Sequence, residues 1–413
     1  MTRVSNDSIR LSIDETKIKA TAMSIKIGIG KLRIGTGGGK SWESYWASLI
    51  SATVENVTPT NVILTFPLAK PELTDTDFII AGFTISSAIW TNAILTLSLT
   101  KPVVFGDVPV VTFIKSGGTA NITNNTLPIL DNYTTAAAYS LRKLRTAYTG
   151  SAIQVRRSID NVTQDIGFDG AFLDEDALTT FIGVASGYIS IWYDQSGNAV
   201  NLANTAIYQP LIVLNGVLLK FNNRPYVSFD GSNDTLYKVT VGVLQNKTWG
   251  GWFIIARFRS VPVANRILAI VSSRLHLAGG LTAGKYFTGG RRLDGDTTQN
   301  LDSTADITTS QKQLTAIADY ANSNLYLDID GANDASKLDF QADGATSNTT
   351  STINLGGSGS NGVNASDSDI WEAILFNIDQ SANKAVIQGN QSAFFLINQE
   401  IIEDNIEFNS TIE

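Results

Sequence analysis

The stretch IWYDQSGN, Ile191–Asn198, decides how the second half of this chain is interpreted. Two aromatic residues precede an acid, an amide and a Ser-Gly pair, and the apolar run before them predicts a buried strand. An Asp at such a strand end commonly accepts N–H bonds from the turn that follows. The alternative is a sugar contact, in which Trp192 or Tyr193 stacks on the ring while Asp194 or Asn198 bonds hydroxyl groups. Strand alternation places Trp192 and Asp194 on one face and Tyr193 on the other, so at most one aromatic accompanies the acid.

Composition bounds the function classes that the chain can belong to. A net charge of −8 over 413 residues argues against a nucleic-acid partner, which needs a basic surplus. The absence of cysteine excludes disulfides and Cys-based zinc sites, and the single histidine, His276, leaves no His cluster for a metal. The local sequence RLHLAG predicts that His276 lies in a strand rather than acting as a general base.

No segment of the sequence predicts membrane insertion or export. No run approaches the roughly 20 apolar residues that a membrane span needs. The first residues, MTRVSNDSIRLSIDE, lack the apolar core of a signal peptide. We therefore expect a protein made in the cytoplasm that does not leave by the general secretory route.

Residues 1–44 differ in pattern from the rest of the chain. Ile25, Ile27 and Ile29 alternate with Lys and Gly, which predicts a strand. Because its glycines provide no side chains to pack, this strand gains most by adding to the sheet edge of another chain. We interpret it as an attachment arm followed by a Gly-rich hinge at GTGGGKS, and an unstructured leader is the alternative.

Residues 45–130 contain short strand-like runs such as NVILTF, DFIIAG and VPVVTFI, separated by Pro, Gly, Asn and Asp. Strands at this spacing with few helical segments predict a β-sandwich. The segment resembles the immunoglobulin-like modules that are repeated in bacterial adhesins and virion proteins.

The pattern changes from about residue 131. Ala137, Leu141, Leu144 and Tyr148 recur at a spacing of three to four, which predicts an amphipathic helix with a solvated basic face. A second short helix is expected at DEDALTTFIG, with Asp174 as its N-cap.

Three segments of this second half resemble a known family. They are AYSLRKLRTAYTGSAIQVRRSIDN, GYISIWYDQSGNAVNLANTAIYQP and NNRPYVSFDGSNDTLY. Together they resemble the catalytic module of the α-L-arabinofuranosidase B family, and YDQSG with VRRS upstream is the specific combination. The resemblance implies a concanavalin-A-like or laminin-G-like jelly roll over residues 131–400. The fold class expected for the chain is therefore all-β.

The resemblance does not carry the family's chemistry with it. A retaining glycosidase needs two carboxyl groups about 5–5.5 Å apart. In the resembled enzymes these acids lie downstream of YDQSG, in a Gly-rich segment that also holds a vicinal cysteine pair, and this chain has no cysteine. The downstream acids that the chain does offer align with no such segment: Asp294, Asp296, Asp328, Asp330 and Glu372. We assign no catalytic residue and expect no enzyme, with glycoside hydrolase activity left as an alternative.

Asp328, Asp330 and Asp334 in the run DIDGAND are candidate calcium ligands, because calcium prefers hard oxygen donors. Their spacing lacks the terminal bidentate Glu of the helix-loop-helix type, and a polar hairpin loop is the alternative. No other cofactor is expected.

Together these features predict a structural, surface-displayed bacteriophage virion protein of fibre, tail or head-decoration type. Its jelly roll would be a lectin-like tip for host or environmental glycans. Its expected partners are other virion proteins, bound through the arm, and further copies of itself, with a trimer as one candidate assembly. It would be synthesised in the host bacterial cytoplasm and end on the virion surface. Two alternatives remain: an active α-L-arabinofuranosidase-like hydrolase, and a bacterial cell-surface adhesin, for which the acidic tail 401–413 offers no sorting signal.

The attachment-arm interpretation leads to a first prediction. Deletion of residues 1–40 should abolish incorporation into phage particles while the remaining chain stays folded. Particle occupancy is measured by quantitative mass spectrometry and folding by circular dichroism. Full occupancy of the truncated protein would contradict the interpretation.

Overall fold

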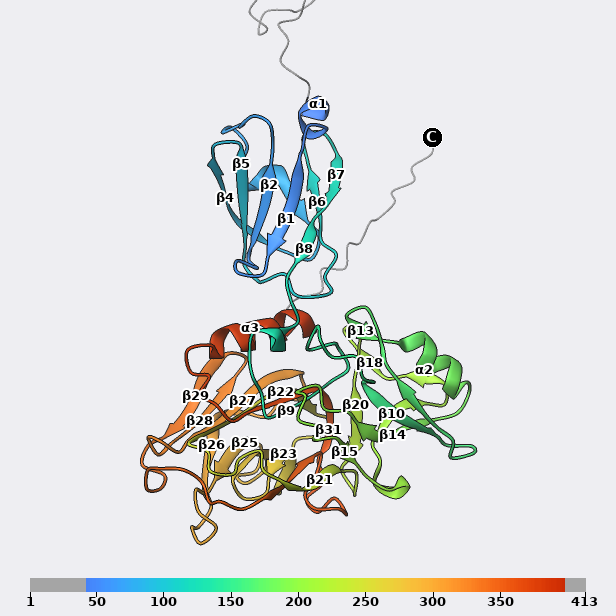
Figure 1. Ribbon diagram of the computed structural model, residues 1–413, viewed down its shortest axis with the longest axis vertical. Helices are drawn as coiled ribbons and strands as arrows, with labels where there is room; N and C mark the ends of the chain where they lie inside the picture. Colours follow the sequence, from blue (N-terminus) through green and yellow to red (C-terminus); the bar gives the residue numbers. More distant parts are fainter. Residues whose placement is uncertain (1–41, 398–413) are drawn as a thin grey trace, which may run out of the picture. The chain divides into compact units, whose positions relative to one another are not determined.

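The computed structural model describes residues 42–397. The predicted arm strand with Ile25, Ile27 and Ile29 and the tail 401–413 lie outside the described residues. The described part has an all-β fold with a few short helices, which confirms the expected fold class (Figure 1). None of the helices within 42–397 is long and apolar enough to cross a membrane.

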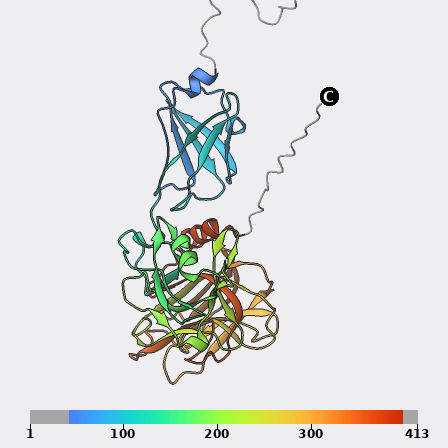
Figure 2. The same cartoon turned by 90° about the vertical axis from the view of Figure 1, so that its right-hand side faces the viewer.

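The first strands form two sheets around one core. The elements are α1 (Trp42–Trp46), β1 (Ser51–Glu55), β2 (Asn61–Thr65), β3 (Phe78–Ile80), β4 (Ile85–Thr91), β5 (Ile94–Leu99), β6 (Val110–Phe113), β7 (Gly118–Asn121) and β8 (Thr123–Asn125). One sheet has the order β4-β5-β2-β1-β8 and the other β3-β6-β7. Their strands overlie and cross one another in the view of Figure 2.

Alternation explains why these strands form a sandwich. In β1 and β2 every second side chain is buried, so each strand presents one apolar face and one wetter face. Val54, Leu64 and Phe113, from both sheets, meet in a single apolar cluster. This arrangement is the β-sandwich that the sequence predicts for this segment.

The remaining strands, β9 to β31, form the jelly roll, in which β22 is an interior strand paired on both sides. The elements are β9 (Ala137–Ser140), β10 (Ile153–Arg157), β11 (Thr163–Ile166), β12 (Phe168–Asp169), β13 (Phe172–Leu173), α2 (Glu175–Ile182), β14 (Gly187–Trp192), β15 (Leu202–Ala203), β16 (Leu211–Leu214), β17 (Val217–Leu218), β18 (Lys220–Phe221), β19 (Arg224–Pro225), β20 (Val227–Asp230), β21 (Leu236–Val241), β22 (Trp249–Phe258), β23 (Arg266–Val271), β24 (Leu275–Gly279), β25 (Lys285–Gly290), β26 (Gln299–Asp306), β27 (Lys312–Asp319), β28 (Asn324–Ile329), β29 (Ala332–Lys337), β30 (Ser351–Leu355), β31 (Asp367–Phe376) and α3 (Lys384–Phe395).

Strand β22 shows how the layers of the jelly roll are built. It pairs with β27 on one side and β31 on the other. Trp252 and Ile254 point into the main core, whereas Phe253 and Ile255 point to the opposite face. Helix α3 covers that opposite face, where its Ile387 packs with Phe253 (Figure 1). A strand buried on both faces explains the nearly unbroken apolar run WGGWFIIARF.

The helix predicted over residues 137–148 is wrong. Residues 137–140 form β9, which pairs antiparallel with β31 and is buried on both faces. The three-to-four spacing that predicted a helix is produced by a strand followed by an irregular segment. The basic face is also not solvated as a whole, because Arg142 is only 4% exposed and forms a buried ion pair.

Other local predictions are confirmed. Asp174 is the N-cap of helix α2, and its carboxylate accepts the Ala177 N–H at 2.9 Å. His276 lies in β24, where burial lowers its pKa to about 4, so the imidazole is neutral near pH 7.

Candidate functional site

The Asp194 carboxylate, in the stretch Ile191–Asn198, is hydrogen-bonded within the protein through both of its oxygens. Its two carboxylate oxygens accept the backbone N–H groups of Ala138 at 2.8 Å, Ser196 at 2.8 Å and Val200 at 3.0 Å. They also accept the Ser196 hydroxyl at 2.6 Å. The side chain is 3% exposed. With four donors on two buried oxygens, the carboxylate has little left to offer a ligand.

Gln195 hydrogen-bonds the backbone of the same segment, residues 140–144. Its Oε1 accepts the Leu144 N–H at 2.8 Å, and its Nε2 donates to the carbonyls of Ser140 and Arg142, both at 3.0 Å. Side chains of the motif therefore take the place of helical i→i−4 partners in residues 138–144. This substitution explains why the predicted helix does not form there.

The other three candidate sugar residues do not form a site with Asp194. Trp192 has no exposed surface and packs against Tyr139, with 6.2 Å between ring centroids. Tyr193 donates its hydroxyl to Asp165 at 2.8 Å, and Asn198 donates to the backbone carbonyls of residues 135 and 136. Neither of the two cavities described below is lined by any of the four.

The candidate calcium ligands have separate protein partners. The pairs are Asp328 with Lys384 at 2.6 Å, Asp330 with Lys312 at 2.6 Å, and Asp334 with the Thr304 hydroxyl at 2.8 Å. Across residues 42–397, no cluster of three or more His, Asp or Glu side chains could hold a metal ion.

Other acids downstream of the motif are held in ion pairs. Glu372 has no exposed surface and binds Arg142 through two bonds of 2.7 and 2.9 Å, with a third bond from the Ser140 hydroxyl. Asp294 accepts bonds from Thr349 and Arg274, which hold the pKa of that carboxyl below its usual value. The Glu372 carboxylate is therefore inaccessible, whereas that of Asp294 is 49% exposed and is held by Arg274 and Thr349.

A polar cleft of about 700 Å³ lies elsewhere on the jelly roll. We call it the Asp230 cleft. Its chemistry comes from six side chains on β10, β14, β20 and the segments that follow η4 (Ala206–Tyr208), β20 and β22: Arg156, Tyr188, Gln209, Asp230, Asp234 and Arg259.

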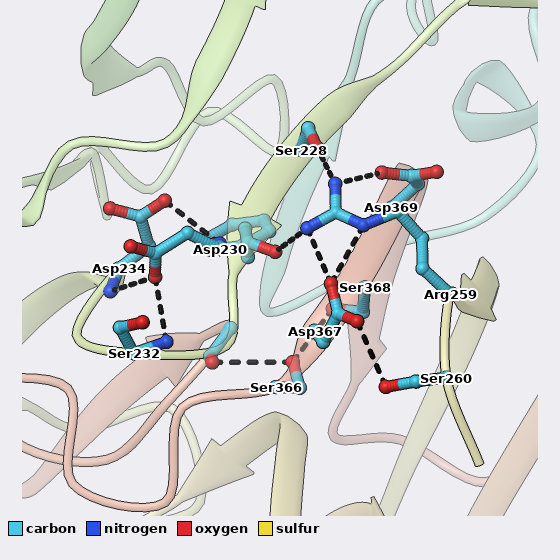
Figure 3. A network of polar contacts seen from close by, with 12 residues as sticks. Ser228, Asp230, Ser232, Asp234, Arg259, Ser260, Ser366, Asp367, Ser368 and Asp369 are labelled. Carbon is cyan, nitrogen blue, oxygen red and sulfur yellow. Dashed lines mark hydrogen bonds and ion pairs between the residues drawn. The ribbon is translucent and has the colours of Figure 1, made fainter. Parts of the chain in front are cut away.

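A tight turn at the end of β20 forms one wall of this cleft. Asp230 Oδ1 accepts the N–H groups of Ser232, Asn233 and Asp234 at 2.8 to 3.2 Å. Asp234 Oδ2 in turn accepts the Asp230 N–H at 2.9 Å (Figure 3). Gly231 adopts a φ of 74°, and a side chain there would collide with β31. The run FDGSND thus folds into a self-capped turn that carries two carboxylates.

The two carboxylates differ in their surroundings. Asp234 is 8% exposed, whereas Asp230 is exposed to solvent. Burial, and to a smaller extent the nearby charge of Asp230, raise the pKa of Asp234 to about 7. The cleft therefore holds one carboxyl group that is partly protonated near neutral pH.

Arg259, beyond the end of β22, ties the turn to β31 (Figure 3). Its guanidinium donates to Asp367 at 2.7 Å, to Asp369 at 3.1 Å and to the Phe229 carbonyl at 2.6 Å. It also donates to the Ser228 hydroxyl. Each nitrogen of this guanidinium has a protein acceptor.

Arg156, on β10, is held in the same way. It donates to Gln209 at 2.7 Å, to Asn161 at 2.8 Å and to the Ala206 carbonyl at 3.3 Å. Its guanidinium also lies 4.9 Å from the ring centroid of Tyr188. These three bonds use three of the five N–H donors of the Arg156 guanidinium.

A second cavity of about 360 Å³ is lined by Phe172, Arg224 and Phe394 among others. Arg224 stacks on both rings, at 4.9 Å from Phe172 and 4.2 Å from Phe394. Aromatic rings and a guanidinium that stack on one another make a packing cluster, and we take the Asp230 cleft as the candidate site.

The sequence analysis did not identify the cleft. It assigned no ligand role to Asp230 or Asp234, which the structure places in the turn at the end of β20. Two acids four positions apart around a Gly turn were the available signal. The sequence could not show that Arg156 and Arg259 also line the cleft, because only the folded sheet brings them to this turn.

Residues 131–210 match the family described as alpha-L-arabinofuranosidase B, catalytic. This match confirms the resemblance over that span, roughly a fifth of the chain. No protein with a curated description matches the chain.

Similar solved structures share little sequence with the chain. A GH54 α-L-arabinofuranosidase soaked with a cyclic sulfate inhibitor has 16% identity and a TM-score of 0.43 over 63% of each chain. The CBM40 of the Ruminococcus gnavus IT-sialidase has 15% identity and a TM-score of 0.31, over 39% of this chain and 95% of that one. The chain thus spans 63% of the length of the arabinofuranosidase structure.

The bonds of Asp194 predict a large stability loss in Asp194→Ala. Removing the carboxylate leaves buried N–H groups without acceptors, at about 1–3 kcal/mol each, so we expect about 3–5 kcal/mol in total. Asp379→Ala is the matched control, because Asp379 bonds the N–H and hydroxyl of Ser381 in the same way but on the surface. That variant should lose about 1 kcal/mol or less. Equal losses for the two variants in urea unfolding would contradict the assignment.

The raised pKa of Asp234 predicts a pH-dependent stability. Because the folded state holds the proton more tightly than the unfolded chain, wild-type stability should fall as pH rises from about 4 to about 7. Asp234→Asn keeps an oxygen for the Asp230 N–H but cannot ionise, so it should become the more stable protein above pH 7. Each pKa unit corresponds to about 1.4 kcal/mol, which limits the difference to a few kcal/mol. Parallel stability curves for the two proteins between pH 4 and pH 8 would show that the pKa is not raised.

Proposed function

We propose that the chain is a carbohydrate-binding, non-hydrolytic surface protein of a bacteriophage particle, with the Asp230 cleft as its sugar site. The single observation that supports this most is the distribution of carboxylates. The carboxylates of Asp194 and Glu372 are buried and hydrogen-bonded within the protein, whereas Asp230 and Asp234, although hydrogen-bonded within their own turn, line the cleft.

The placement of the two cleft carboxylates favours binding over hydrolysis. A glycosidase sets its two carboxyl groups on either side of the scissile bond. Asp230 and Asp234 belong to one turn, and each accepts the backbone N–H of the other. They therefore stand on the same wall of the cleft, where their remaining oxygens suit the hydroxyl groups of a sugar.

One observation favours the hydrolase alternative. A carboxyl group with a pKa of about 7 beside another carboxylate is the pairing that general acids use. An activity assay therefore belongs in the test of the proposal.

The placement on a virion rests on sequence. An arm suited to strand addition, an immunoglobulin-like module and a lectin-like module follow one another, and the chain needs no disulfide. Several copies on one particle would let weak sugar sites act together. A bacterial adhesin would share the modules, and detection of the chain in purified phage particles separates the two.

The proposal predicts binding without turnover. The full-length protein should bind a subset of an array of bacterial surface glycans and should not hydrolyse 4-nitrophenyl α-L-arabinofuranoside. Ala206→Trp, which adds bulk at an exposed position lining the cleft, should weaken binding at least tenfold. Ala332→Trp, at an exposed alanine outside the cleft, is the control and should bind as wild type. Turnover that Asp234→Asn abolishes would overturn the proposal in favour of the hydrolase.

A further inference from the structure

Strand β4 forms a free edge of the sandwich. It pairs with β5 on one side, and no other strand within residues 42–397 pairs with it (Figure 1). The edge strands β3, β7 and β8 of the same sandwich are three or four residues long, whereas β4 has seven. A long edge strand presents a row of unpaired N–H and C=O groups, and a short one offers few. Strand β4 is therefore the edge of the sandwich best suited to a further strand.

The side chains at this edge do not protect it from another chain. Edge strands are commonly blocked by charged residues or by proline. Residues 78–100 contain neither, although 16% of the chain is charged. Ile89 on β4 and Ile94 on β5 are 58% and 39% exposed, and both lie on the outer face of the sheet. An uncharged edge beside exposed isoleucines favours pairing with a strand of another protein chain.

The sequence of this edge is complementary to itself. A bulge at Ser86 interrupts the pairing with β5, so the regularly paired stretch is SAIWT, residues 87–91, and its central residue is Ile89. In an antiparallel pair centred on this residue, each Ile89 faces Ile89 of the partner subunit. Ser87 then faces Thr91 of the partner subunit, and Ala88 faces Trp90 of the partner subunit. Hydroxyl pairs and apolar pairs stabilise antiparallel strands, and the small alanine leaves room for the indole ring.

The two faces of the sheet also match in such a pair. Ala88 and Trp90 pack against the core of the sandwich and are only partly buried, whereas Ile89 points away from the core. Pairing would therefore extend the apolar core on the inner face and cover both copies of Ile89 on the outer face. Each chain carries a net charge of −8, so two copies repel each other in general, and an edge without charges adds nothing to that repulsion.

We propose that two copies of the chain associate by antiparallel pairing of their β4 strands. The two five-stranded sheets become one continuous sheet across the dimer, with a two-fold axis that passes through Ile89. Because a pairing of five residues buries little surface, the dimer should dissociate on dilution. The inference does not depend on the sugar site, but it places two Asp230 clefts in one assembly, where weak sites act together.

Sedimentation velocity on the full-length protein, over a series of concentrations, tests the association. We expect a monomer–dimer equilibrium that Ile89→Lys weakens at least tenfold, because it sets two like charges directly opposite each other. Ile79→Lys is the matched control, since Ile79 is 53% exposed on β3, in the other sheet of the sandwich. That variant should dimerise as wild type does. Thermal melting followed by circular dichroism should show that both variants stay folded.

The absence of cysteine from the chain allows a direct test of the register. Facing residues of antiparallel strands have Cα atoms about 4.5–5.5 Å apart, which is within the range that a disulfide spans. Ile89→Cys should therefore form a disulfide-linked dimer under mild oxidation, seen on a non-reducing gel. Ile79→Cys should remain largely monomeric under the same conditions.

Three outcomes would contradict the inference. The protein could stay monomeric at all concentrations, or it could form a dimer that Ile89→Lys leaves intact. Association that is lost on deletion of residues 1–40, without an Ile89→Cys cross-link, would assign the contact to the N-terminal arm instead. Each of these results leaves the proposed sugar binding standing, because Ala206→Trp tests that binding separately.

Discussion

The jelly roll depends on one interaction, the clamp that Asp194 and Gln195 place on the segment that runs from β9 to Leu144. Backbone N–H and C=O groups in this segment would otherwise need hydrogen-bond partners from a helix or a strand. The side-chain oxygens of Asp194 and Gln195 and the Gln195 amide nitrogen bind these groups instead. The clamp sets β9 against β31, and β31 in turn pairs with β22 and β20. The turn after β20 carries the cleft, so the position of the site follows from this clamp.

Sequence predicted those features that are local. The strand ending at Trp192, the Asp174 cap and the sandwich each depend on periodicity or turn chemistry within a short window. The helix over 137–148 failed because its partners lie about 50 residues further on, in Asp194 and Gln195. The cleft was missed for the same reason, since Arg156 and Arg259 reach the Asp230 turn only through sheet pairing.

Asp194 and Asp234 show how the surroundings of an aspartate decide whether it serves the fold or can bind a ligand. Asp194 and Asp234 are both buried, but Asp194 accepts four hydrogen bonds and Asp234 only one. The four donors occupy most of the lone pairs of the Asp194 carboxylate. Asp234 has one donor, burial raises its pKa to about 7, and the residue lines the cleft. Sequence alone gives both residues the same appearance, an acid at a strand end.

The residues of the quoted motif that lie within the family match therefore serve packing more than chemistry. Within residues 131–210, the quoted motif supplies the clamp, the buried Trp192 and the bonds that hold Asn198. A reaction would need carboxylates elsewhere, and Glu372 and Asp294 are locked in ion pairs. Residues that define a family by sequence can thus be those that keep its fold, and the function must be argued from the atoms left free to bind.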